Sequence, residues 1–182
     1  FLAIVCLLIS SSFAQEETPD GWKKGGMTSI NLSQVSLTNW AAGGENSLSG
    51  NLLFNGFANM KKGKLIWDNT LDFGYGIVKQ GETSSRKSDD KLELSSKVGQ
   101  HAFKSWYYSG LLNFKTQVSP GYKYSEDAAI DDVQISDFLA PGYFNIAIGM
   151  DYKPNDKFTA MISPVSGKVT IVNDTLYSVA YG

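Results

Sequence analysis

Two carboxylates four residues apart, Asp68 and Asp72, are the first candidates for chemistry in this sequence. A pair of carboxylates acts as acid and base in glycoside hydrolysis when the two groups lie about 5 to 10 Å apart. Both belong to a stretch with strand periodicity, in which residues four apart are separated by roughly 13 Å. The single histidine, His101, lies in a predicted turn, where nothing supports a Ser-His-Asp triad. We therefore expect that the chain is not an enzyme.

Charged side chains on the polar strand faces suggest a different chemistry, the selection of ions or solutes inside a pore. One strand register places Asp72 opposite Lys97 and Asp68 opposite His101. Charges that alternate in this way also occur in packed, self-neutralising barrel interiors, so both interpretations stay open. The candidates that we expect to face the lumen are Asp68, Asp72, Glu93, Lys97, Lys115 and Gln117.

The elements that must position these residues follow the pattern of the stretch 47–79. Even-numbered residues from Leu48 to Met60 are apolar or glycine, and the apolar phase switches to odd numbers from Leu65 onward. A period of two predicts a strand with one apolar and one polar face. Each arm exceeds the roughly 9 to 11 residues that a tilted strand needs to cross a bilayer.

Lys62-Gly63 between these arms suits the two-residue loop of a hairpin, because glycine tolerates positive φ. A loop centred there pairs Lys61 with Lys64 and Gly50 with Tyr75. In a later hairpin, one register places Glu93 opposite Lys115.

Further strands are expected along the rest of the chain from the same alternation. The first strand covers 27–37, with a slip in phase at Gln34 that indicates a bulge or the end of the strand. The other predicted strands cover 89–100, 106–117, 144–153 and 158–163, and the segments 168–172 and 175–182 could add one or two more.

The predicted connections alternate in length, which favours an up-and-down meander. Short ones at 61–64, 101–105 and 154–157 share one end, and longer ones at 38–45, 80–88 and 119–137 share the other. Outer-membrane barrels have short periplasmic turns, longer external loops and aromatic girdles. We expect the acidic loop 119–137 to be solvated, since its spacing matches no calcium loop. The predicted interface anchors are Trp67, Trp106, Tyr108, Tyr152 and Phe158.

Composition narrows the class of protein. Residues 1–14 resemble the apolar and small-residue part of a secretory signal peptide, and 15–26 is expected to be an exposed lead-in to a barrel over 27–182. Cys6 is the only cysteine, so disulfide and thiol chemistry are not expected in the barrel. The net charge of -2 and the lack of a basic stretch argue against nucleic acid as a partner.

Several short strings resemble a known group of proteins. They are Asn39-Trp40-Ala41-Ala42-Gly43-Gly44, Tyr75-Gly76, Arg86-Lys87-Ser88-Asp89-Asp90-Lys91, Thr116-Gln117, Phe138-Leu139-Ala140-Pro141 and Ser163-Pro164. From about Trp22 to its end, the chain resembles an uncharacterised family of predicted outer-membrane β-barrels from the Bacteroidetes group of Gram-negative bacteria. The resemblance implies a fold and a location in the cell outer membrane, but no substrate or catalytic residue. It also leads us to expect closing strands beyond Gly182.

The sequence thus predicts an all-β protein, a transmembrane antiparallel up-and-down β-barrel in the outer membrane. The expected function is a passive pore or small-solute transport channel. The first alternative is an accessory barrel with a filled lumen that binds a partner through its external loops, and the second is a secreted soluble β-barrel or sandwich. Expected partners are outer-membrane lipid, together with small solutes or a protein at the external loops. We expect no cofactor and no metal.

Overall fold

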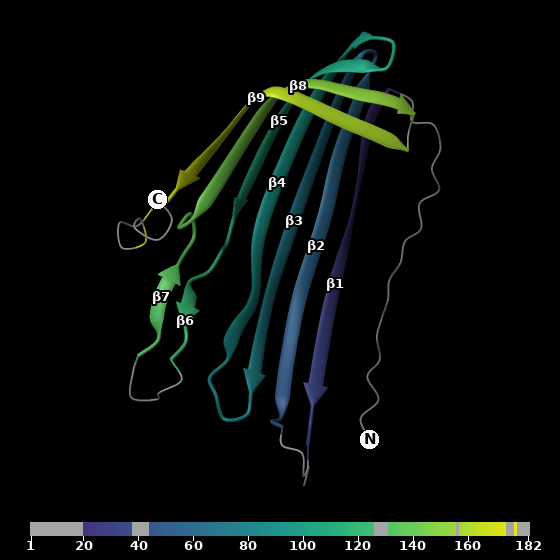
Figure 1. Ribbon diagram of the computed structural model, residues 1–182. Coiled ribbons are helices and arrows are strands. Elements are labelled where there is room, and N and C mark those ends of the chain that lie inside the picture. Colours follow the sequence, from purple (N-terminus) through teal and green to yellow (C-terminus); the bar gives the residue numbers. More distant parts are fainter. Residues whose placement is uncertain (1–19, 38–43, 126–130, 156, 174–176, 178–182) are drawn as a thin grey trace.

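A computed structural model describes residues 20–37, 44–125, 131–155, 157–173 and 177. The predicted signal peptide 1–14 lies outside these residues. The described chain is all-β, and seven strands form one antiparallel up-and-down sheet in the order β1-β2-β3-β4-β5-β8-β9 (Figure 1). These strands are β1 Gly21–Val35, β2 Ser47–Lys62, β3 Leu65–Gln80, β4 Arg86–Phe103, β5 Trp106–Thr116, β8 Gly142–Asn155 and β9 Phe158–Ile171. A separate hairpin, β6 Gly121–Lys123 with β7 Val133–Ser136, lies within the connection from β5 to β8.

The β2–β3 hairpin confirms the predicted strands but corrects their register by two residues. Lys62 pairs with Leu65, and Gly50 therefore faces Ile77 rather than Tyr75. The loop is Gly63-Lys64, with Gly63 at φ 55°. A turn with glycine at its first central position needs positive φ only there, which explains why the loop is centred one residue later than predicted. Because the shift is even, every side chain keeps its predicted face.

Several strand boundaries also differ from the prediction. β1 begins at Gly21, so residues 21–26 of the predicted lead-in are strand, and it ends at Val35 without a bulge at Gln34. β4 begins at Arg86, which shortens the connection after β3 to 81–85. The predicted segments 158–163 and 168–172 form the single strand β9.

Short and long connections lie at opposite ends of the sheet, as predicted from the sequence. The turns at 63–64, 104–105 and 156–157 share the upper end in Figure 1, called the short-turn end below. The connections 36–46, 81–85 and 117–141 share the lower end, called the long-connection end. None of the helical segments among the described residues is long and apolar enough to cross a membrane.

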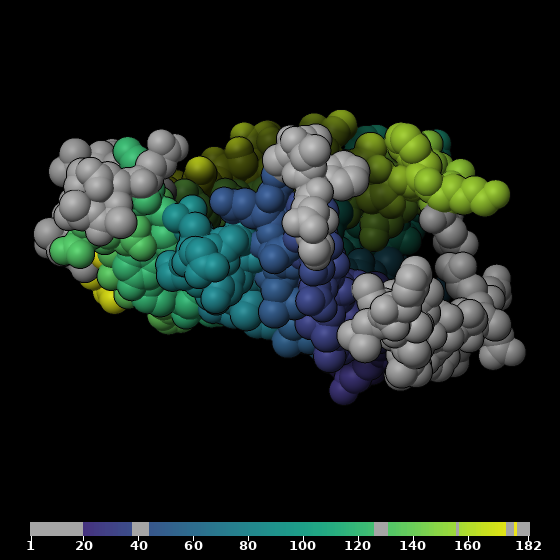
Figure 2. All heavy atoms as spheres, turned by 90° about the horizontal axis from the view of Figure 1, so that it is seen from below, coloured from purple at the N-terminus to yellow at the C-terminus, as the bar shows by residue number. Residues whose placement is uncertain are grey.

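The sheet is strongly curled, and no closed barrel is formed by the described strands. The β8–β9 hairpin crosses over the upper ends of β1 to β4 in Figure 1. Figure 2 shows the curl from below, with the yellow-green atoms of β8 and β9 along one side and the purple to teal atoms of β1 to β4 along the other. The edge strands β1 and β9 do not pair with each other, and in this meander of seven they run in the same direction.

The apolar faces of the strands are exposed, and a hydrophobic core is nearly absent from the described part of the chain. Ala140 and Tyr177 are the only buried apolar residues there. Large apolar side chains are 36–71% exposed on every strand of the sheet. Examples are Ile30, Leu32, Leu52, Phe54, Ile77, Leu94, Val98, Leu112, Ile146, Ile148, Val165 and Val169.

A bulge in the β8–β9 hairpin depends on a glycine. Ile148 pairs with Val165 and Met150 with Ile162, so Gly149 faces the extra residues Ser163-Pro164. Proline cannot donate to the strand ladder, which accounts for the irregularity at this point. A Cβ added to Gly149 would lie 2.0 Å from the Ile162 carbonyl oxygen.

We predict that Gly149→Ala lowers the free energy of unfolding by about 1 to 3 kcal/mol, because backbone atoms would have to move to admit the methyl group. Gly167→Ala in the same hairpin is the control, since a Cβ there meets no atom within 4 Å. Its effect should stay within about 0.5 kcal/mol. Denaturant unfolding followed by tryptophan fluorescence measures both, and equal effects of the two variants would contradict the close packing at Gly149.

Candidate functional site

The polar face of the sheet is its concave face. The Lys153 Nζ atom on β8 lies 3.9 Å from the Asp68 Oδ2 atom on β3. Two strands, β4 and β5, separate β3 from β8 in the sheet, a path of roughly 14 Å. Side chains of these strands meet only if the sheet bends toward the side on which they project. Most of the exposed apolar side chains accordingly lie on the convex face, whereas Met27 and Leu53 lie on the concave face.

Four charged residues form a cluster on the concave face, near the short-turn end. We call Asp68, Lys97, Asp151 and Lys153 the charge cluster. The Lys97 Nζ atom lies 2.5 Å from the Asp151 Oδ2 atom, in an ion pair that reaches from β4 over β5 to β8. The Asp151 side chain is 1% exposed, whereas that of Lys97 is 23% exposed. This pair is therefore largely removed from solvent.

Aromatic and hydroxyl side chains surround the charge cluster. The Tyr107 ring lies 5.8 Å from the Lys153 Nζ atom and packs edge-on against the His101 ring, with centroids 5.3 Å apart. The Ser109 side chain is buried, and its Oγ atom has no hydrogen-bond partner. The second carboxylate oxygen of Asp151, Oδ1, also lacks a partner. Buried polar atoms without a protein partner are rare, so we take this cluster as the candidate site.

A ladder of amides crosses the middle of the concave face. The Asn113 amide donates to Glu93 Oε1 and to Ser95 Oγ, each at 2.8 Å, and accepts from the Asn145 amide at 3.1 Å. The Lys91 Nζ atom lies 2.9 Å from Glu93 Oε2. These contacts join β4, β5 and β8 by polar side chains alone.

The predicted lumen residues are distributed over this face in a register that differs from the prediction. Asp68 faces Lys97, and Asp72 faces Glu93, instead of the predicted Asp72–Lys97 and Asp68–His101 pairs. The reason is that β4 begins earlier than predicted and a bulge follows Gly76, which shifts the strand pairing.

Two other predicted lumen residues lie nearer the long-connection end. Lys115 faces Glu93, so that predicted register is confirmed. Gln117 follows β5 and donates through its amide to the carbonyl oxygens of Asp137 and Ala140, at 3.2 and 3.3 Å. These two hydrogen bonds hold the connection to β8 against the end of β5. Exposure to a lumen stays a prediction for all six residues.

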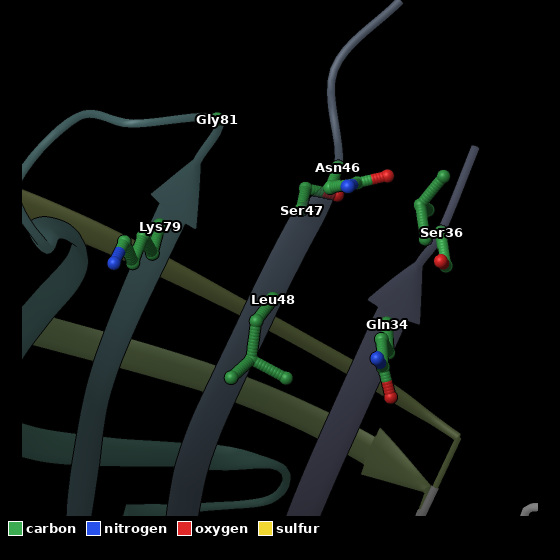
Figure 3. A pocket seen from close by; sticks show the side chains of 8 residues that line it. Gln34, Ser36, Asn46, Ser47, Leu48, Lys79 and Gly81 are labelled. Atoms are coloured by element: carbon green, nitrogen blue, oxygen red, sulfur yellow. The ribbon is translucent and has the colours of Figure 1, made fainter. Parts of the chain in front are cut away.

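Two hollows lie among β1, β2 and β3 toward the long-connection end. The larger, of about 370 Å³, has no charged lining residue, and most of its lining side chains carry a hydroxyl or an amide group. It is lined by Asn31, Ser33, Ser49, Gly50, Asn51, Val78 and Ser88. The smaller, of about 180 Å³, is at the strand ends (Figure 3). Lys79 is its one charged lining residue, and Asn46 accepts a backbone hydrogen bond from Leu37 at 2.7 Å beside it.

The predicted aromatic anchors lie close to one another on the convex face. Trp106 and Tyr152 have ring centroids 4.9 Å apart, and Tyr152 and Phe158 6.4 Å apart. Trp67 lies 5.6 Å from Trp22 and donates through its indole nitrogen to Ser96 Oγ at 2.9 Å. Tyr108 is 61% exposed, two residues along β5 from Trp106. These rings follow the short-turn end, and their contact with lipid stays a prediction.

Asp151, Lys153 and Tyr107 were not predicted as site residues. The alternation in β8 did indicate that Asp151 and Lys153 lie on a polar face. No local signal shows that the sheet curls far enough to bring β8 to β3. Among the described residues, no group of three or more His, Cys, Asp or Glu side chains is arranged to hold a metal ion.

Comparison with known proteins gives one match. A family model described as "Protein of unknown function (DUF3078)" matches residues 32–122, half of the chain, from the end of β1 to β6. No curated protein and no solved structure matches the chain. The resemblance to a family of unknown function is confirmed, whereas the bacterial group and the outer-membrane location stay predictions.

We predict that Lys97→Met lowers the free energy of unfolding by about 3 to 5 kcal/mol, because it leaves the buried Asp151 carboxylate without its counter-charge. Lys61→Met, at an exposed lysine of β2, is the matched control. Adding Asp151→Asn to Lys97→Met should recover part of the loss, since the uncompensated charge is then removed. Denaturant titration measures all three variants, and equal costs for Lys97→Met and Lys61→Met would show that the pair is not buried.

Proposed function

The chain belongs to the DUF3078 family of proteins of unknown function, and we propose that it forms the wall of an outer-membrane β-barrel, a passive pore or transport channel for small solutes. One observation carries the proposal. The sheet bends toward its charged face and leaves its apolar face outward, which is the polarity of a barrel surrounded by lipid. In the alternative of a secreted soluble barrel or sandwich, the apolar face would lie inside.

The extent of the apolar surface supports a lipid environment. Soluble monomeric proteins rarely expose apolar patches larger than a few hundred Å². Here all seven strands of the sheet present apolar side chains on the convex face. Contact with acyl chains would cover this face on every strand at once, at about 25 cal/mol for each Å² of apolar surface removed from water.

Strand length and the aromatic rings support the same placement. The seven strands have 11 to 18 residues, and a tilted strand needs about 9 to 11 to cross a bilayer. Tryptophan and tyrosine favour the boundary between lipid and water. In the proposed barrel the aromatic rings at the short-turn end lie at the periplasmic boundary, and the long connections face outward from the cell.

Closure of the proposed barrel requires further strands. β1 and β9 run in the same direction, and an antiparallel closure between them needs an odd number of added strands. The total is then even, as in the single-chain barrels of bacterial outer membranes. A count near eight leaves an interior that side chains fill, whereas 16 or more leave an aqueous channel.

A second candidate function is an accessory barrel that binds a protein partner through its external connections. The β6–β7 hairpin favours it, because Tyr124 lies under the Arg86 guanidinium at 4.5 Å from the ring centroid and accepts a hydrogen bond from the Lys87 backbone. Lys87 also pairs with Asp90 at 2.7 Å. These contacts give the long-connection end an ordered surface to which a partner could bind.

We predict that Leu52→Arg lowers barrel stability by about 2 to 4 kcal/mol, because it places a charge among lipid chains near the middle of the membrane. Asn51→Arg is the control on the neighbouring residue, whose side chain projects to the concave face. It should cost far less. Denaturant titrations in lipid vesicles measure both, and equal costs would contradict the assignment of faces.

We predict stable single-channel conductance steps from the purified full-length protein in a planar bilayer, after heat-modifiable migration on a gel shows that a barrel has formed. Lys115→Glu should shift ion preference from anions toward cations, because it reverses a charge that we place on the lumen wall. Heat modifiability without conductance would reject the pore and favour the partner-binding barrel.

A further inference from the structure

We infer that the charge cluster of Asp68, Lys97, Asp151 and Lys153 closes the short-turn end of the concave face, so that the lumen is open toward the long connections and blocked toward the turns. The inference deepens the proposed function and rests on it where it concerns a lumen. It makes these four residues, rather than Glu93 or Lys115, the narrowest part of the passage.

The first support is that the cluster spans the hollow of the sheet. Lys97 reaches Asp151 over one intervening strand, and Lys153 reaches Asp68 over two. Each pair therefore connects two strands that are not neighbours in the sheet, across the concave side of the curl. The β8–β9 hairpin, which carries two of the four residues, crosses over the ends of β1 to β4 in Figure 1. Its concave face is held against β3 and β4 by these two contacts.

The second support is the contrast in burial along one face. At the cluster, Asp151 is 1% exposed and Ser109 4% exposed. Toward the long-connection end, the same face has the uncharged hollow of about 370 Å³ around Ser49 and Asn51. Asp151 and Ser109 at the centre of the cluster are thus excluded from solvent, and the other three cluster residues are 23–37% exposed. The hollow toward the other end of the face is open.

Small residues beneath the cluster allow this filling. Gly99, Ser109 and Gly149 are direct neighbours on β4, β5 and β8. They form a row without large side chains, between Lys97 on one side and Asp151 on the other. The long Lys97 side chain can cross β5 because the residues beneath it have only small side chains or none.

The charges of the cluster form a closure that opens when one ion pair is lost. Its two lysines and two aspartates balance, so the filled state requires no counter-ion. Only one oxygen of the Asp151 carboxylate is engaged, by Lys97, while the other has no partner. Loss of one ion pair therefore removes the main contact that excludes water from Ser109. In an Asp151→Asn variant, Lys97 would add a positive charge to an opened passage.

The test uses the reactivity of a cysteine placed at Ser109, in a Cys6→Ser background of the full-length protein in lipid vesicles. A small, charged, membrane-impermeant thiol reagent should modify Ser109→Cys at least tenfold more slowly than Ser49→Cys, which lies in the open hollow. Adding Asp151→Asn should raise the rate at position 109 at least tenfold. Glu82→Gln, an exposed loss of the same charge in the connection after β3, should leave it unchanged.

Lys97→Gln removes the other partner of the same ion pair and should also expose position 109. With two variants, a folding defect in one of them does not decide the test. Heat-modifiable migration checks that each variant has folded. If Ser109→Cys reacts as fast as Ser49→Cys, or if neither Asp151→Asn nor Lys97→Gln accelerates it, the closure is overturned.

Conductance separates this inference from the proposed function. Asp151→Asn should at least double single-channel conductance and shift preference toward anions. Protection of position 109 that depends on Asp151, without conductance in any variant, would support the closure and overturn the pore. Conductance in all variants with position 109 always reactive would support the pore and overturn the closure.

Discussion

The contact between Lys153 and Asp68 exists because the sheet bends toward its polar face, and the rest of the structure depends on that bend. Side chains converge on the concave side of a curled sheet and spread apart on the convex side. Most of the converging side chains here are charged or carry amide or hydroxyl groups, and most of the spreading ones are apolar. The described strands consequently do not bury this apolar surface among themselves. The stabilising contribution of that surface must come from a surrounding apolar medium or from another layer of protein.

At the most buried part of the concave face, polar groups have to be paired with other side chains because water does not reach them. Burial of a charge is costly unless the charge is paired. Asp151, the most buried charged residue of the face, is paired with Lys97. The amide of Asn113 does the same for Glu93 by linking three strands. Small residues matter equally, because Gly99 and Gly149 leave the room that the long side chains occupy. Pairing and small size together allow a charged face to become an interior.

Local pattern predicted the long strands of the main sheet and their faces, but it missed the β6–β7 hairpin and did not predict which residues meet. The alternation in 47–79 fixes one polar and one apolar face whatever the register, so the two-residue error at Gly63 moved no side chain to the wrong side. The pairing of Asp68 was predicted wrongly because the bulge after Gly76 and the early start of β4 leave no periodic signal. Asp151 was assigned to the correct face but not to the site, since its contact with Lys97 depends on the curvature of the whole sheet.

The two ends of the sheet differ in construction, and the difference gives the proposed barrel a direction. At the short-turn end, aromatic rings pack on the convex face, and the charge cluster occupies the concave face. At the long-connection end, Asp90 accepts hydrogen bonds from the backbone of Val118 and Ser119, and an uncharged hollow lies on the concave face of β1 to β3. A solute entering the barrel from the outside would therefore meet hydroxyl and amide groups first and paired charges last. Such a passage would select between solutes at its inner end, where the exclusion of water strengthens the electrostatic interaction between each charge and a solute.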